Sequence, residues 1–313
     1  MTSANKNIQG IFFIVLALLI FSLQDVAVKW IGGDYSVIQI VVIRSLIALP
    51  ATLILFRLEG GQGMPTTERH VLEYVRGFLL FLSFTTYMMG IAALTLADLG
   101  TIRNSAPLMI TLLSVVWLGE KVNIHHWLAL IIGFMGVLLI VQPGSATFNQ
   151  GSIFALIATI SYALNVMITR KLRTSDSSAT MAYYSSLVYL VAAVVVAPLP
   201  LVVGEMPDAH PSIAFLFRAW AMPSFLDLMI MAGLGLIWAV GMYMIARAYS
   251  LTQASIAAPF EYVALPISAM WGFLLWQEVP TMATWIGAIL TIGSGLYILY
   301  RERRAKPTPV ETG

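Results

Sequence analysis

The chain has no cysteine and very few charged residues. Among its 313 residues, the absence of cysteine excludes disulfides, thiol catalysis and cysteine-ligated metal sites. Only 10% of the residues are charged, whereas soluble domains carry about 25%. This scarcity excludes a disordered chain and the surface of a water-soluble enzyme. The hydrophobic share of 59% instead indicates a membrane protein.

Several other signatures are missing as well. The net charge is only +2 and no long run of one sign occurs, so nucleic acid is not expected as a partner. No phosphate-binding loop, dinucleotide fingerprint or nucleophile elbow is present, which excludes ATP-driven transport by this chain alone and predicts no cofactor. His125 and His126 are adjacent and therefore point to different helix faces, so no metal site is expected. We expect no enzymatic activity.

Long apolar runs dominate what is present. A helix needs about 20 mostly apolar residues to cross a membrane. The runs predict an all-α integral membrane protein with ten transmembrane helices, near Gly10–Ile31, Val37–Phe56, Leu72–Leu94, Leu99–Leu118, Trp127–Val141, Ile153–Lys171, Met181–Val203, Leu226–Tyr249, Ala254–Trp276 and Trp285–Tyr300. The connections are short and leave no room for a soluble domain.

The basic residues of the loops predict the orientation. With the N-terminus inside, eleven Lys and Arg residues lie on the inner side, including Lys121, Lys171 and the basic tail, and only Arg218 lies outside. Short loops rich in Lys and Arg stay in the cytoplasm. We therefore predict a multi-pass protein of the bacterial cytoplasmic (inner) membrane with both termini in the cytoplasm.

The two halves of the sequence resemble each other. Gln9-Gly10 aligns with Gln150-Gly151, and Leu118-Gly119-Glu120 aligns with Trp276-Gln277-Glu278, in the same order. Each half then holds five predicted helices, and an odd number places the second copy upside down. The interpretation is a five-helix repeat at 1–148, an inverted repeat at 149–303 and a cytoplasmic tail at 304–313. Such repeats enclose a central cavity in transporters.

Specific motifs extend this picture to a family. The motifs are Leu94-Thr-Leu-Ala-Asp98, Ala106-Pro107, Leu118-Gly-Glu-Lys121, Gly133-Phe-Met-Gly136, Gln142-Pro-Gly144, Ala258-Pro-Phe-Glu-Tyr262, Pro266, Gln277-Glu-Val-Pro280 and Trp285-Ile-Gly287. With them the chain resembles the EamA-type ten-helix exporters and permeases of the drug/metabolite transporter superfamily. The resemblance implies a basket of helices around a central cavity, alternating access by rocking of two helix groups, and a monomer or homodimer surrounded by lipid.

Ionisable residues within the spans are costly and need a partner, water or a function. Asp25 and Lys29 are four residues apart, which favours a local salt bridge, although Asp25 also suits a cavity mouth. Arg44 suits packing or gating as well as ligand contact. Arg76 is expected to reach the lipid phosphates. Arg247 suits either a helix end or a cytoplasmic gate.

Arg103 and Glu261 are the most informative charges. They precede the repeat-related Pro107 and Pro266, so inverted halves would bring them to one cavity from opposite sides. The two readings are a ligand or coupling site and a salt bridge that locks the halves together. Pro107 and Pro266 each remove one helix hydrogen bond and are candidate bending elements. Together with Asp25, Arg44 and Arg247 they form the predicted gating or coupling set.

Aromatic and amide groups are expected around this pair. With Glu261 and Arg103, the predicted substrate-binding residues are Tyr262, Trp238, Tyr162, Asn165, Asn104 and Tyr87. Aromatic faces beside a carboxylate suit an ammonium, and a guanidinium suits a carboxylate. The hypothesis is a secondary transporter for a small amino-acid-like, zwitterionic or cationic amine metabolite. The alternatives are a flippase for lipid or lipid-linked substrates on the same fold and a broad drug/metabolite exporter.

Overall fold

The computed structural model describes residues 3–118, 124–145, 148–172, 175–251, 260 and 262–304, and the regular structure in these ranges is entirely helical. The helices of the first half are α1 (Ser3–Ile31), α2 (Val37–Leu58), α3 (His70–Ile91), α4 (Leu96–Arg103), α5 (Ala106–Leu118) and α6 (Ile124–Val141). Those of the second half are α7 (Gly151–Leu172), α8 (Ser178–Val196), α9 (Leu199–Val203), α10 (Pro211–Phe217), α11 (Phe225–Leu251), α13 (Ala264–Trp276) and α14 (Met282–Arg304).

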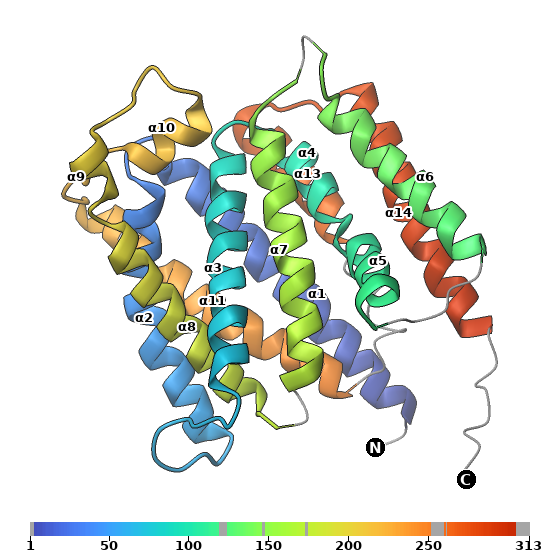
Figure 1. Ribbon diagram of the computed structural model, residues 1–313, viewed down its shortest axis with the longest axis horizontal. Coiled ribbons are helices and arrows are strands. Elements are labelled where there is room, and N and C mark those ends of the chain that lie inside the picture. The colour runs from blue at the N-terminus through green and yellow to red at the C-terminus, as the bar shows by residue number, and fades with distance from the viewer. Residues whose placement is uncertain are drawn as a thin grey trace.

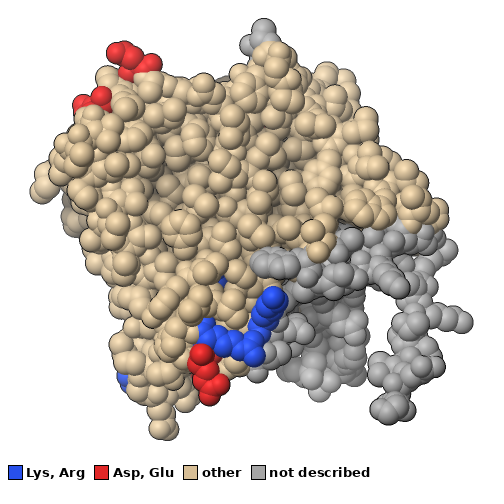
Figure 2. Space-filling model, in the orientation of Figure 1, with Lys and Arg blue, Asp and Glu red and all other residues tan. Residues whose placement is uncertain are grey.

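Six stretches of helix in the described ranges are long and apolar enough to cross a membrane. They are Ile8–Ile31, Val37–Leu58, His70–Ile91, Gly151–Thr169, Ala179–Val203 and Phe225–Ile245, and shorter apolar helices occupy Trp127–Val141, Ala264–Trp276 and Met282–Ile298. Figure 2 shows the charged side chains of one face gathered toward the two ends of the molecule, with an uncharged band between them. This arrangement fits a multi-pass membrane protein, as predicted.

The two ends of the helical bundle differ. The start of α1 and the end of α14 lie at the same end, which we call the terminal end (Figure 1). The short helices α9 and α10 lie at the other end, which we call the α10 end. There the Tyr35 hydroxyl donates to Asp227 Oδ2 at 2.7 Å and fixes the α1–α2 turn to the start of α11. The same hydrogen bond raises the pKa of Tyr35, because it favours the neutral phenol.

The fourth predicted span is not one continuous helix. It is divided into α4 and α5 by a turn at Asn104 and Ser105. Pro107, the second residue of α5, has no amide hydrogen to continue the helix of the preceding turn, but it is well tolerated in the first turn of a new helix. The prediction of a single helix over Leu99–Leu118 was therefore wrong at this point.

A similar boundary occurs in the ninth predicted span. α13 begins at Ala264, two residues before Pro266, while residues 252–259 and 261 lie outside the described ranges. Pro266 thus also falls in the first turn of a helix. The positions of Pro107 and Pro266, aligned by the sequence, both lie just inside the start of a helix segment within a span.

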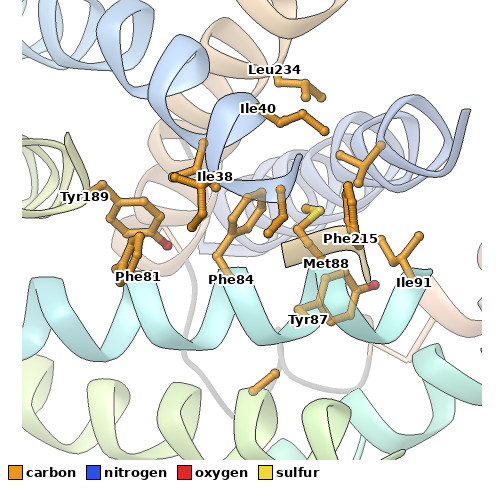
Figure 3. Close-up of a cluster of buried hydrophobic side chains, with 14 of the residues drawn as sticks. Ile38, Ile40, Phe81, Phe84, Tyr87, Met88, Ile91, Tyr189, Phe215 and Leu234 are labelled. Atoms are coloured by element: carbon orange, nitrogen blue, oxygen red, sulfur yellow. The ribbon is translucent and has the colours of Figure 1, made fainter. Parts of the chain in front are cut away.

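A shared apolar core holds the long helices together. Residues of α1, α2, α3, α8 and α11 contribute to one cluster, and Figure 3 shows Ile38, Phe81, Phe84 and Tyr189 meeting in it. α6 and α14 pair with each other along one side of the bundle (Figure 1). A Cβ on Gly136 would lie 2.7 Å from the Gly287 carbonyl oxygen, so only glycine permits this close approach.

Candidate functional site

A polar cluster lies where the fourth span is broken. We use this name for Asp25 of α1, Tyr87 of α3, Arg103 at the end of α4, and Tyr162 of α7. The Tyr87 hydroxyl donates to Asp25 Oδ2 at 3.0 Å, and Arg103 Cζ lies 5.1 Å from the centroid of the Tyr87 ring. The charge of Arg103 also interacts with Asp25 and with Tyr162. An acid, a base and two phenols from four helices thus meet in one place.

The accessibility of this cluster is uneven. Arg103 is exposed although its neighbours Thr101 and Ile102 are buried, and Tyr162 is 41% exposed. Asp25 is buried, with 5% of its surface exposed. Since α4 ends at Arg103, the chain break places an exposed arginine beside a buried carboxylate. Broken membrane helices also form substrate and ion sites in other transporters.

Three buried polar atoms, of Asp25 and of the chain neighbours of Asp25 and Arg103, have no hydrogen-bond partner in the described part of the chain. They are Oδ1 of Asp25, Oε1 of Gln24 and Nδ2 of Asn104. Buried polar atoms in folded proteins are nearly always paired with protein, water or ligand. Two acceptors on α1 and one donor on the residue that follows Arg103 in the chain are therefore available for polar groups other than those of the described chain.

Lys29 does not pair with Asp25, and the predicted local salt bridge was wrong. Its Nζ forms an ion pair with Glu278 Oε1 and lies 5.1 Å from the centroid of the Trp276 ring. Glu278 Oε2 accepts from the amide of Leu96, the first residue of α4, at 3.1 Å. A carboxylate at a helix start is favoured by the free amides there. We call Lys29, Glu278, Trp276 and the Leu96 amide the Glu278 latch.

The end of α13 positions this carboxylate. Gln277 has a left-handed backbone with φ of 55°, and the Glu278 amide donates to the Gly272 carbonyl at 3.1 Å. The amide of Gln277 itself donates to the Phe273 carbonyl at 3.0 Å, the 5→1 bond with which a left-handed residue commonly ends a helix. A Cβ on Gly272 would lie 2.9 Å from Glu278 Oε2, so the glycine leaves room for the carboxylate to fold back over α13.

Arg44 lies in an aromatic box at the centre of α2. Its Cζ is 3.6 Å from the centroid of the Phe84 ring, 4.5 Å from that of Trp238 and 5.4 Å from that of Tyr189. The side chain is 1% exposed, and its Nε and Nη1 have no hydrogen-bond partner among the residues that the structure describes. Trp238, predicted to bind substrate, is buried and belongs to this Arg44 box. Ring faces attract a guanidinium most strongly where water is excluded.

Arg76 is also buried, so the expectation that it reaches the lipid phosphates was wrong. It donates to Glu73 Oε2 at 3.2 Å, to Thr169 Oγ1 at 2.9 Å, and to the carbonyl oxygen of Met181 at 2.7 Å. Asn165, predicted to bind substrate, donates through Nδ2 to the Arg76 carbonyl at 3.1 Å. The side chain of Arg76 turns inward because these acceptors on α3, α7 and α8 surround it. We call this set the Arg76 network.

The remaining predicted site residues are placed as follows. Tyr262 is buried, and its hydroxyl occupies the space that a Cβ on Gly295 of α14 would need. Glu261 lies outside the described residues, as do the side chains of Arg247 and Pro107. The pairing of Arg103 with Glu261 therefore stays a prediction. The acid that the structure brings to Arg103 is Asp25.

Sequence reasoning missed the Glu278 latch and the ring partners of Arg44. Glu278 was noticed only as part of a repeated motif, and no local pattern links it to Lys29, which is 249 residues away in the chain. Phe84 and Tyr189 gave no signal, because aromatic residues are common in membrane helices. In the ranges that the structure describes, no group of three or more His, Asp and Glu is placed to hold a metal ion.

The fold, with its uncharged band and a polar cluster at a broken span, fits a membrane transporter. The EamA-like transporter family matches residues 8–142 and again 149–300, so the chain belongs to this family. A solved structure with 15% sequence identity shares the fold with a TM-score of 0.63, covering 97% of this chain and 100% of its own.

Characterised relatives of similar length are transporters of different metabolites. An S-adenosylmethionine uptake transporter of Rickettsia bellii is 27% identical over 95% of both chains. A pseudopaline exporter of Pseudomonas aeruginosa is 27% identical over 90% of this chain and 93% of its own. A riboflavin transporter of Vibrio cholerae is 25% identical over 97% of each chain. The protein is accordingly a small-molecule transporter of bacterial type.

Proposed function

We propose that the protein moves a small zwitterionic metabolite across the bacterial cytoplasmic membrane by alternating access. The observation that carries this proposal is the polar cluster, in which a carboxylate and a guanidinium from different helices meet at the broken fourth span. Asp25 would receive an ammonium group and Arg103 a carboxylate, with the Tyr87 ring beside them.

The relatives' substrates are compatible with this chemistry to different degrees. S-adenosylmethionine has an α-ammonium and an α-carboxylate group, which match Asp25 and Arg103. Riboflavin has neither group. The relatives therefore favour a zwitterion only in part. A transport assay has to compare zwitterionic compounds with compounds that, like riboflavin, lack both charged groups.

The distribution of charge supports the proposed orientation. The terminal end holds most of the basic loop residues, so both termini would face the cytoplasm. The Glu278 latch joins α1, α4 and α13 at the α10 end, which would face outward. A conformation closed at this outer end is one of the two states that alternating access requires.

Counterflow into vesicles tests the proposal. Purified protein is reconstituted with internal S-adenosylmethionine, and uptake of labelled compound is measured against methionine, riboflavin and a cationic amine as competitors. Asp25→Asn should lower uptake about thirtyfold, because truncating one partner of a buried charge pair costs about 2 kcal/mol or more. Asp34→Asn, an exposed acid in the α1–α2 turn, is the matched control and should transport normally.

Two results would contradict the proposal. One is unchanged uptake in Asp25→Asn, with the thermal stability of the variant equal to that of the parent. The other is competition by riboflavin alone. Movement of a fluorescent phospholipid between leaflets instead of small-molecule uptake would favour the flippase alternative.

A further inference from the structure

A pocket of about 410 Å³ lies at the α10 end, separate from the polar cluster. The ends of α1 and α3 form one side of it, and α10 with the preceding loop forms the other. Its lining residues are Val28, Lys29, Gly32, Gly33, Ile91, Ala92, Pro207, Ala209, Pro211, Ala214, Phe215, Arg218 and Trp276. Among the described residues of this lining, the ionisable ones are two bases, Lys29 and Arg218.

Arg218 is an unusual residue at this end. It is the only Lys or Arg in the loops that connect the helices there. Its Nη1 donates to the carbonyl oxygen of Gly32 at 2.5 Å and to that of Tyr35 at 3.4 Å, which fixes the guanidinium against the α1–α2 turn. Its other two nitrogen atoms donate to no group in the part of the chain that the structure describes. A fixed guanidinium with free donors suits a carboxylate.

Lys29 contributes the second positive charge and links the pocket to the Glu278 latch. Its side chain is 13% exposed, and its present partner is the Glu278 carboxylate. Trp276, over which the Lys29 ammonium lies, also lines the pocket. A ligand carboxylate bound in the pocket would therefore compete with Glu278 for the same ammonium.

We infer that this pocket is an access site that receives the carboxylate of the transported metabolite, between Arg218 and Lys29, before the metabolite reaches the polar cluster. This inference rests on the proposed function, because it assigns the pocket to the same substrate. Binding there replaces Glu278 as the partner of Lys29 and so weakens the contact of α1 with the end of α13, while Glu278 keeps its bond to the Leu96 amide of α4. The site thus selects for a carboxylate and loosens the latch with the same interaction.

Cysteine labelling measures occupancy of the pocket without requiring transport. Since the natural chain has no cysteine, Ala92→Cys introduces a single thiol into the lining, and its reaction with a charged maleimide is followed in purified protein. S-adenosylmethionine should slow this reaction about fivefold, whereas decarboxylated S-adenosylmethionine, which lacks only the carboxylate, should not. Acetate should also slow the reaction of Ala92→Cys, but only at a higher concentration than S-adenosylmethionine. Met222→Cys, which is 96% exposed and does not line the pocket, is the control and should react at the same rate throughout.

Two further substitutions predict effects of opposite sign. Arg218→Gln in the Ala92→Cys background should abolish protection, because the fixed guanidinium is lost. Glu278→Gln should lower the concentration needed for protection by about fivefold, because the competing carboxylate is removed. A purely structural role for the latch predicts no gain in affinity. Weaker or unchanged protection in Glu278→Gln would overturn the inference, as would full protection in Arg218→Gln.

A third variant separates this inference from the proposed function. Asp25→Asn should lose counterflow and keep protection of Ala92→Cys, because the two sites are distinct. Loss of protection in Asp25→Asn would show that the pocket is no separate site. Counterflow of S-adenosylmethionine by the parent without any protection of Ala92→Cys, by this compound or by acetate, would overturn the access site and leave the transport function standing. Protection by acetate without counterflow of S-adenosylmethionine would support the site and contradict the choice of substrate.

Discussion

Two buried arginines on neighbouring helices are held in opposite ways. Arg76 of α3 is surrounded by oxygen acceptors and an acid, whereas Arg44 of α2 is surrounded by three aromatic rings. Hydrogen bonds fix direction and distance, so the Arg76 network determines how α3, α7 and α8 sit against each other. Ring faces attract a cation over a broad surface, so the Arg44 box joins α2, α3, α8 and α11 with less geometric demand.

This difference indicates which helices are held rigidly and which can shift. An arginine with all its partners in place resists displacement, because each lost hydrogen bond leaves a buried polar group unpaired. An arginine against rings loses little when the rings slide. We therefore expect the helices around Arg44 to shift more readily than those around Arg76.

The largest predicted effect comes from breaking the Arg76 network. Arg76→Met should destabilise the protein by about 3–5 kcal/mol, because it leaves the fully buried Glu73 without its positive partner. The unfolding midpoint of purified protein in detergent measures this. Glu73→Gln combined with Arg76→Met should recover part of the loss, and a double variant as unstable as the single one would argue against the unpaired charge as its cause.

A much smaller effect is expected at Arg44. Arg44→Met removes a buried cation that has no acid partner in the described residues and keeps an apolar side chain among the rings. The free energy of unfolding should change by no more than about 1 kcal/mol, because the lost ring attraction is offset by the relieved desolvation. The same denaturation assay compares it directly with Arg76→Met. Equal losses in the two variants would remove the proposed distinction.

The smallest effect is the coupling between Arg44 and a single ring. A double-mutant cycle of Arg44→Met and Phe84→Leu isolates it from the packing that each substitution also changes. The coupling energy should be about 0.5 kcal/mol, the lower end of the range measured for cation–ring contacts. Tyr183→Leu in place of Phe84→Leu provides a buried aromatic of α8 with no ring contact to Arg44, and its coupling should be near zero.

The sequence predicts the elements of this fold much better than their contacts. Apolar runs located α2, α7 and α11 closely, because membrane helices satisfy their own backbone and are recognisable from local composition. Pro107 lies at the break between α4 and α5, and Pro266 lies in the first turn of α13. The partner of Lys29 could not be found in this way, since Glu278 is 249 residues away and an acid lies only four residues from Lys29.

The site shows the same limit. Tyr87, Asn104 and Tyr162 were expected near Arg103, and the structure places Tyr87 and Tyr162 there, with Asn104 next in the chain. Asn165 was expected with them, but its amide holds the Arg76 carbonyl instead. Which face of a helix turns toward the cavity depends on the packing of several helices at once, and a single sequence gives only the periodicity of each.

The short helix α4 connects two features that have been described separately. Its first residue, Leu96, donates its amide to Glu278, and its last residue is Arg103 of the polar cluster. Eight residues of α-helix make a rod about 12 Å long, stiff along its axis. If the access site works as inferred, Glu278 keeps its bond to Leu96 when Lys29 leaves it, and we expect a shift of Glu278 to move Leu96 and, through α4, Arg103 at the other end. The length of α4 is therefore the distance over which the Glu278 latch and the polar cluster would be mechanically coupled.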